Sequence, residues 1–227
     1  MMPSSGPTGS RPTVETLPLP HRLFLLSLQE EKGRLDADSE PVRGSLLSAA
    51  AVAELRIAGL LHDRGGKAGR TNTPAPATID PFLAQVLGDV PPDQPRSWFD
   101  VLESRWDKAE RFVQEQLAGA GHITIEHHQV FGPIRRKKIV TVDPAQVQAL
   151  RSRIRDAVRT DSAPASVSLG DAVLTTLAVD GLVGTMFRWR ELRTHKPAIR
   201  ALADRVEQEL PGLRKALSYS IALRRSA

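Results

Sequence analysis

The segment Leu46–Leu61, with the sequence LLSAAAVAELRIAGLL, decides the fold that we expect. Its leucine, alanine and valine side chains fall on every side of a helix, and only Glu54 and Arg56 carry charge. A helix that is apolar all round is stable when other helices surround it. The segment is also too short to span a bilayer. The sequence therefore predicts a helix, with Ser45 as its N-cap, at the centre of a helical core.

Helical periodicity extends over most of the remaining chain, because apolar residues recur every three or four positions. Asp80-Pro81, Asp143-Pro144 and the Ser168–Asp171 pair are typical helix starts. Aromatic residues make up only 4% of the chain, so leucine, valine, isoleucine and alanine must form most of the core. The predicted helices cover residues 21–29, 46–61, 80–87, 97–117, 144–159, 168–178, 186–192, 197–210 and 213–221. Trp98 and Trp106 would both pack in the core from one face of the helix over 97–117.

These patterns predict a mainly all-α protein with a single helical domain over residues 18–227. Residues 1–17 are poor in apolar side chains and are expected to form a disordered tail. The Gly/Pro-rich segment Arg64–Thr78 is predicted to be an exposed loop, with a small pair of strands as the alternative.

One segment, His122–Asp143, instead has the pattern of a projecting β-hairpin. Ile123 and Ile125 alternate with polar residues, Phe131-Gly132-Pro133 provides a turn, and the β-branched segment 139–142 forms the returning strand. Four cations follow the turn directly: Arg135, Arg136, Lys137 and Lys138. A hairpin that carries such charge predicts contact with an anionic surface or partner.

The charge of the whole chain supports the same prediction. The net charge is +5, and residues 131–160 alone contain eight basic and two acidic side chains. Arg151, Arg155 and Arg159 are spaced four residues apart, so they are expected on one exposed helix face near the hairpin base. A basic balance of this kind favours nucleic acid, a phospholipid surface or an acidic protein as partner.

The sequence offers little support for an enzyme, and we expect no catalytic residues and no cofactor. It has neither a phosphate-binding glycine loop nor a Gly-x-Ser-x-Gly elbow, and it contains no cysteine. No metal site is expected either, because His122 and His128 would lie about 20 Å apart on one face of a strand. The absence of cysteine and of a secretory signal pattern predicts a cytoplasmic protein.

Trp189, among cations, could pack or could contact a membrane or ligand.

Several segments occur in an order that resembles the bacterial branch of the Golgi phosphoprotein 3 family. They are PLPHRLFLLSLQEEKGRL, LLSAAAVAELRIAGLL, PATIDPFLAQVL and FVQEQLAGAGHITIEHHQVFGPIRRKKIVTVDP, followed by an arginine-rich helix. The resemblance implies a non-enzymatic peripheral membrane protein, with a hairpin that serves membrane contact and oligomerisation. Eukaryotic relatives bind phosphatidylinositol 4-phosphate and the cytosolic tails of Golgi glycosyltransferases, so anionic lipid and membrane-protein tails are the implied partners.

The resemblance also implies where a lipid headgroup would bind. The family has a tryptophan before the central helix, an arginine at its start and an Arg-x-x-Arg before the hairpin. This sequence departs from that pattern, with Ser39, Ser48, Asp107 and Glu110 in those registers. The cations nearest to them are therefore the candidates for binding a headgroup: Arg43, Arg105, Lys108 and Arg111.

The sequence is also compatible with two other functions. A helix over 97–117 followed by a basic hairpin is the order of a winged-helix nucleic-acid-binding protein, although Asp107, Glu110 and Glu115 would repel phosphates. Alternatively, the hairpin could join a partner's sheet edge, or a second copy of the chain, in a protein–protein adaptor.

Overall fold

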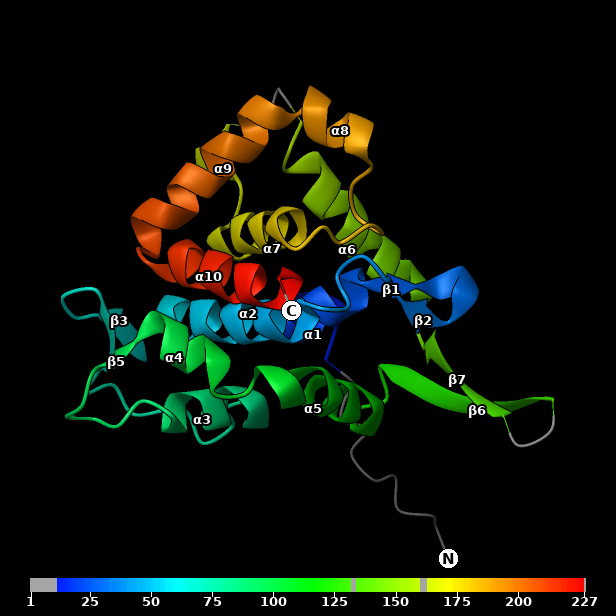
Figure 1. Ribbon diagram of the computed structural model, residues 1–227, viewed down its shortest axis with the longest axis horizontal. Coiled ribbons are helices and arrows are strands. Elements are labelled where there is room, and N and C mark those ends of the chain that lie inside the picture. Colours follow the sequence, from blue (N-terminus) through cyan, green and yellow to red (C-terminus); the bar gives the residue numbers. More distant parts are fainter. Residues whose placement is uncertain (1–11, 132–133, 160–162, 227) are drawn as a thin grey trace, which may run out of the picture.

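The structure, a computed structural model, describes residues 12–131, 134–159 and 163–226, and only the backbone of residues 128–131 and 134–136. The described chain is mainly helical and forms one domain, as predicted (Figure 1). Its α-helices are α1 (Leu19–Leu26), α2 (Arg43–Ile57), α3 (Pro81–Gly88), α4 (Trp98–Glu103), α5 (Trp106–Gly119), α6 (Pro144–Asp156), α7 (Leu169–Asp180), α8 (Trp189–Thr194), α9 (Lys196–Glu209) and α10 (Leu213–Arg225). Short 3-10 helices are η1 (Val14–Thr16), η2 (Glu30–Lys32) and η3 (Pro164–Ser166).

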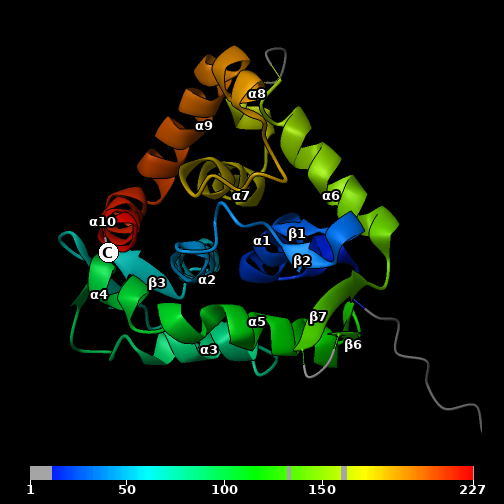
Figure 2. The same ribbon diagram turned by 45° about the vertical axis from the view of Figure 1, so that its right-hand side comes forward.

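Helix α2 lies at the centre of the domain, which confirms the prediction from its all-round apolar pattern. In Figure 2 it is enclosed by α10, α7, α1 and α5, and each of them contacts it. The helix begins three residues before the predicted Leu46 and ends four before Leu61. Ser45 is not its N-cap but lies within the first turn, with its hydroxyl 2.6 Å from that of Ser220 on α10.

The start of α2 lies against the start of α5 at an unusually close approach. A Cβ atom added to Gly44 would lie only 1.9 Å from the backbone oxygen of Trp106. Only glycine allows the two backbones to come so close, because any side chain would force them apart. This contact fixes the two helix ends that carry Arg43 and Glu110.

The described strands form three small antiparallel sheets. The predicted hairpin is confirmed as β6 (Ile123–Phe131) and β7 (Ile134–Thr141), with Ile123 opposite Thr141. β1 (Leu28–Gln29) pairs with β2 (Arg34–Leu35) around η2. β3 (Leu61–Asp63), β4 (Lys67–Arg70) and β5 (Arg96–Ser97) form the third sheet, so the strand-pair alternative for residues 64–78 was correct in part.

The predicted helix over residues 97–117 is in fact two helices, α4 and α5. Between them, Ser104 Oγ donates to Asp89 Oδ2 at 2.8 Å, and Arg105 leaves the helical conformation with φ −137°. Trp98 is buried as expected, but Trp106 is 37% exposed, so its prediction as a core residue was wrong. The Arg224 guanidinium covers its ring, 3.4 Å from the ring centre.

The folded domain begins before residue 18. Val14 and Leu17 are buried, and Val14 N–H donates to the Gln146 side chain of α6 at 2.7 Å. Residues 12–17 of the expected tail are therefore packed on the domain. Residues 1–11 lie outside the described residues.

Candidate functional site

The base of the hairpin is held by the β1–η2–β2 segment, residues 28–35. Ile139 N–H donates to the Gly33 carbonyl at 2.7 Å, and Thr141 Oγ1 donates to Glu30 at 2.9 Å. Gly33 has a φ of +59°, and a Cβ there would lie 2.2 Å from Cγ of Lys138. Because this glycine has no side chain, β7 can pass directly over it. The β1–η2–β2 segment also lies between two polar cavities, one lined by its residues 28–32 and the other by its residues 33–35.

The first cavity, which we name the Arg43 pocket, has a volume of about 300 Å³. It lies between the β1–η2–β2 segment, the starts of α2 and α5, and β7. Its charged lining consists of Arg34, Arg43, Lys137, Asp36, Glu40 and Glu110. Three cations thus meet three acids, and the pocket has no excess of positive charge.

Arg43 is buried at the bottom of this pocket and its hydrogen bonds are largely satisfied. Nη1 donates to Glu110 at 2.8 Å, Nε donates to Ser39 Oγ at 3.2 Å, and Nη2 donates to the Asp36 carbonyl. The Glu110 side chain is 40% exposed, whereas that of Arg43 is only 3% exposed. The structure thus places Ser39 and Glu110 side by side against Arg43. In the family pattern the position of Glu110 belongs to an arginine, so here a carboxylate stands in its place.

The other three headgroup candidates do not line the Arg43 pocket. Arg105 is bound to Asp89, with Nε 2.6 Å and Nη2 2.7 Å from its two oxygens. Arg111 is 75% exposed and lies 3.8 Å from Glu115 one turn later. Lys108 is exposed on α5. The structure therefore does not bring the four candidates together, and a shared role in binding a headgroup stays a prediction.

Of the basic strand, residues 135–138 of β7, only the last two side chains are described. Both are exposed, and Lys137 Nζ donates to Gln114 of α5 at 2.7 Å. Lys138 lies across Gly33. The side chains of Arg135 and Arg136 lie outside the described ones, but β7 pairs their backbone with Gln129 and His128 of β6. The basic strand thus begins at the Arg43 pocket and follows the hairpin outward.

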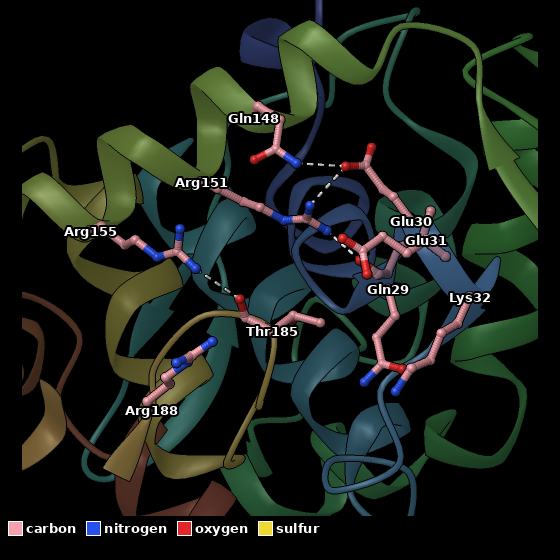
Figure 3. A pocket seen from close by; sticks show the side chains of 10 residues that line it. Gln29, Glu30, Glu31, Lys32, Gln148, Arg151, Arg155, Thr185 and Arg188 are labelled. Atoms are coloured by element: carbon pink, nitrogen blue, oxygen red, sulfur yellow. Dashed lines mark hydrogen bonds and ion pairs between the residues drawn. The ribbon is translucent and has the colours of Figure 1, made fainter. Parts of the chain in front are cut away.

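The second cavity, which we name the Arg151 pocket, has a volume of about 410 Å³ and is shown in Figure 3. It lies between α6, the β1–η2–β2 segment and the loop before α8. Its charged lining consists of Lys32, Arg151, Arg155, Arg188, Glu30 and Glu31. Four cations meet two acids, so this pocket, unlike the Arg43 pocket, has a positive excess.

Arg151 forms the floor of this pocket, which corrects the expectation that it is exposed. It is 7% exposed, and Nη1 donates to Glu30 at 2.9 Å while Nη2 donates to the Leu28 carbonyl. Burial lowers the pKa of Arg151, with Glu30 opposing this shift and the nearby Arg155 adding to it. The Glu30 carboxylate has a further partner, because it also accepts a hydrogen bond from the Gln148 side chain at 2.7 Å.

Arg155, one turn later, is held by neutral carbonyl groups. Its Nε donates to Met186 O at 3.1 Å and its Nη2 donates to Thr185 O at 3.2 Å. Sequence spacing placed Arg155 on the same helix face as Arg151, but no local signal indicated that Lys32 and Arg188 would join them. Lys32 is 119 or more positions from the other three cations, and Arg188 is 33 positions from Arg155, so only the tertiary fold brings them together.

The described residues contain no group of three or more His, Cys, Asp or Glu side chains placed to hold a metal ion. Trp189 is 71% exposed, close to Leu182 and Phe187, with which it lines another cavity of about 340 Å³. Its role at a membrane or ligand stays a prediction.

Comparison with known proteins identifies one matching family. The family model for Golgi phosphoprotein 3 (GPP34) matches residues 19–219, which is most of the chain. No curated protein gives a significant match to the sequence.

Proposed function

The chain belongs to the Golgi phosphoprotein 3 family, and we propose that it is a non-enzymatic peripheral membrane protein that binds anionic lipid headgroups. The family is not known as an enzyme family, and its membership suggests a lipid-associated role. None of the described helices is both long and apolar enough to cross a bilayer. In this proposal, the family membership places the protein at the cytoplasmic surface of a membrane.

The observation that carries this proposal is the position of the basic strand. Figure 1 shows the β6–β7 hairpin projecting from the helical body, and two of its four cations, Lys137 and Lys138, are described as exposed. A cation close to an anionic bilayer contributes about 1 kcal/mol to binding, and salt weakens this attraction. Four cations on one projecting strand could therefore dock the protein.

A headgroup of the phosphatidylinositol 4-phosphate type would, in this proposal, enter the Arg43 pocket. Arg43 is held in place from behind by Ser39 and the Asp36 carbonyl, and Glu110 covers it from the exposed side. A phosphate would have to replace the Glu110 carboxylate, which is free to turn toward water because it is 40% exposed. Phosphate and carboxylate present similar oxygens to a guanidinium, so this exchange needs no new donor.

Vesicle flotation tests the proposal. The wild type should float with vesicles of phosphatidylcholine containing anionic lipid and should stay behind with phosphatidylcholine alone. The variant R135A/R136A/K137A/K138A should lose most of this binding, and added salt should weaken the wild type in the same way.

A matched control removes the same charge elsewhere. Arg64, Lys67, Arg200 and Lys215 are exposed cations on β3–β4, α9 and α10, away from the hairpin in Figure 1. Changing all four to alanine should leave flotation nearly unchanged. Equal flotation of the hairpin variant and the wild type would overturn the role of the basic strand.

A further inference from the structure

We propose that the Arg151 pocket is a binding site for a small phosphate-bearing anion, separate from the Arg43 pocket and from the basic strand. The pocket is about 410 Å³ in volume, within the size range of small-ligand sites. It lies on the other side of the β1–η2–β2 segment from the Arg43 pocket. Nothing in the proposed membrane role of the hairpin requires it.

Charge in this pocket is only partly cancelled. Glu30 is the partner of Arg151, and its oxygens also accept from Thr141 and Gln148. With that pair balanced, three cations remain, Lys32, Arg155 and Arg188. They face the exposed acid Glu31 within the pocket and Glu191 in the adjoining cavity that Arg155 and Arg188 also line. The described residues include no carboxylate in an ion pair with Lys32, Arg155 or Arg188. A positive excess of this kind, in a cavity rather than on an open face, attracts an anion.

Arg155 is also oriented in advance. The Met186 and Thr185 carbonyls use its Nε and one Nη2 hydrogen and leave the remaining guanidinium hydrogens for another acceptor. Because these carbonyls are neutral, they hold the group in place without cancelling its charge. An ordered guanidinium gives up little conformational entropy when it binds an oxyanion.

The floor of the pocket is the buried cation Arg151, which is only 7% exposed. In Figure 3 the Arg188 side chain extends toward the end of Arg155, across the cavity from Lys32. Donors thus come from three segments of the chain. A phosphate, with three or more acceptor oxygens, matches such a set better than a single carboxylate does.

The ligand chemistry could come from a free phosphate ester or from a lipid headgroup, and the test separates the two. Isothermal titration calorimetry with inorganic pyrophosphate measures the soluble case. Flotation with vesicles of phosphatidic acid, compared with phosphatidylglycerol at equal charge, measures the lipid case. We expect pyrophosphate binding that weakens with salt. A preference for phosphatidic acid over phosphatidylglycerol would show that the pocket also binds a lipid headgroup.

The variant K32A/R188A tests the pocket, because both side chains are exposed. The backbone N–H of Arg188, which caps α8 by donating to Glu191, is retained when alanine replaces the arginine. The variant should bind pyrophosphate at least about tenfold more weakly than the wild type, since each lost charge-assisted bond contributes on the order of tenfold. R200A/K215A removes equal charge from α9 and α10 and should bind like the wild type. E31Q, which removes the unpaired acid, should bind more tightly.

Failure of this proposal is distinguishable from failure of the membrane role. The hairpin variant R135A/R136A/K137A/K138A should keep its pyrophosphate affinity, because those residues do not line the Arg151 pocket. No pyrophosphate binding by the wild type, or an equal affinity of K32A/R188A and wild type, would overturn the proposed site. Either result would leave the vesicle experiment unaffected.

Discussion

The Glu110 carboxylate lies 2.8 Å from Nη1 of Arg43 and covers the one buried guanidinium of the Arg43 pocket on its exposed side. Ser39 and the Asp36 carbonyl hold the same guanidinium from behind. A bound headgroup phosphate and Glu110 would therefore compete for one cation. This competition leads to the first prediction.

Changing Glu110 to glutamine should strengthen binding to vesicles that contain phosphatidylinositol 4-phosphate. The amide can still accept from Arg43, but it no longer cancels the charge that a phosphate would meet. We expect a gain of up to about tenfold in vesicle affinity, which corresponds to about 1.4 kcal/mol. E115Q, on the exposed face of the same helix, is the control and should change little. Weaker binding by E110Q than by E115Q would contradict a headgroup site at Arg43.

Changing Gly44 to alanine should destabilise the domain. The new methyl group would lie 1.9 Å from the Trp106 backbone oxygen, and backbone cannot turn aside as a side chain can. Overpacking of this kind costs about 1–3 kcal/mol. Urea unfolding, followed by circular dichroism, measures the loss. G119A on α5, where an added Cβ meets nothing within 4 Å, should be neutral or slightly stabilising. Equal stability of the two variants would mean that α2 and α5 do not approach closely at Gly44.

His21 should make the stability depend on pH. Burial lowers the pKa of His21 because it disfavours the charged ring, and this effect outweighs the opposing Asp80 carboxylate 3.6 Å away. The unfolded chain therefore binds the proton more readily than the folded one. The stability that this provides is complete above about pH 6.5 and is lost as the pH falls toward the folded-state pKa.

Urea unfolding at pH 7.5 and 5.5 measures this effect. The wild type should lose stability over this interval, by at most about 1.4 kcal/mol per pH unit for one proton. H21L should lose less, while H62Q, at an exposed histidine, should behave like the wild type. An unchanged pH dependence in H21L would show that His21 is not the titrating group.

The hairpin should also mediate self-association. β6 and β7 form a two-stranded sheet by themselves in the described chain, so their outer edges can pair with another copy. We expect light scattering to show an oligomer for the full chain and a monomer after deletion of residues 126–136. A monomer in both cases would remove this role and leave the hairpin to membrane contact alone.

Local patterns were sufficient to predict the hairpin and the central helix. Alternating β-branched residues define β6 and β7, and the all-round apolar pattern of 46–61 places α2 in the core. The interruption between α4 and α5 could not be predicted in this way. It depends on Asp89, which binds both Ser104 and Arg105 from 15 and 16 residues away.

The candidate site was predicted less completely, for the same physical reason. The excess of cations in residues 131–160 pointed to the basic strand, whose binding role stays a prediction. Helical spacing alone also placed Arg151 on an exposed face. It is buried because Glu30 and the Leu28 carbonyl, more than 120 residues away, lie over it. Such pairs appear only once the chain is folded.

The β1–η2–β2 segment forms a wall of both pockets and also holds the base of the hairpin through Gly33 and Glu30. A ligand that shifts this wall from one side would change the shape of the cavity on the other and the tilt of the strand bound to it. Thermodynamic reciprocity then requires that membrane docking alter the affinity of the Arg151 pocket by the same factor by which its ligand alters docking. The eight residues 28–35 would thus couple ligand binding in the Arg151 pocket to attachment of the protein to a membrane.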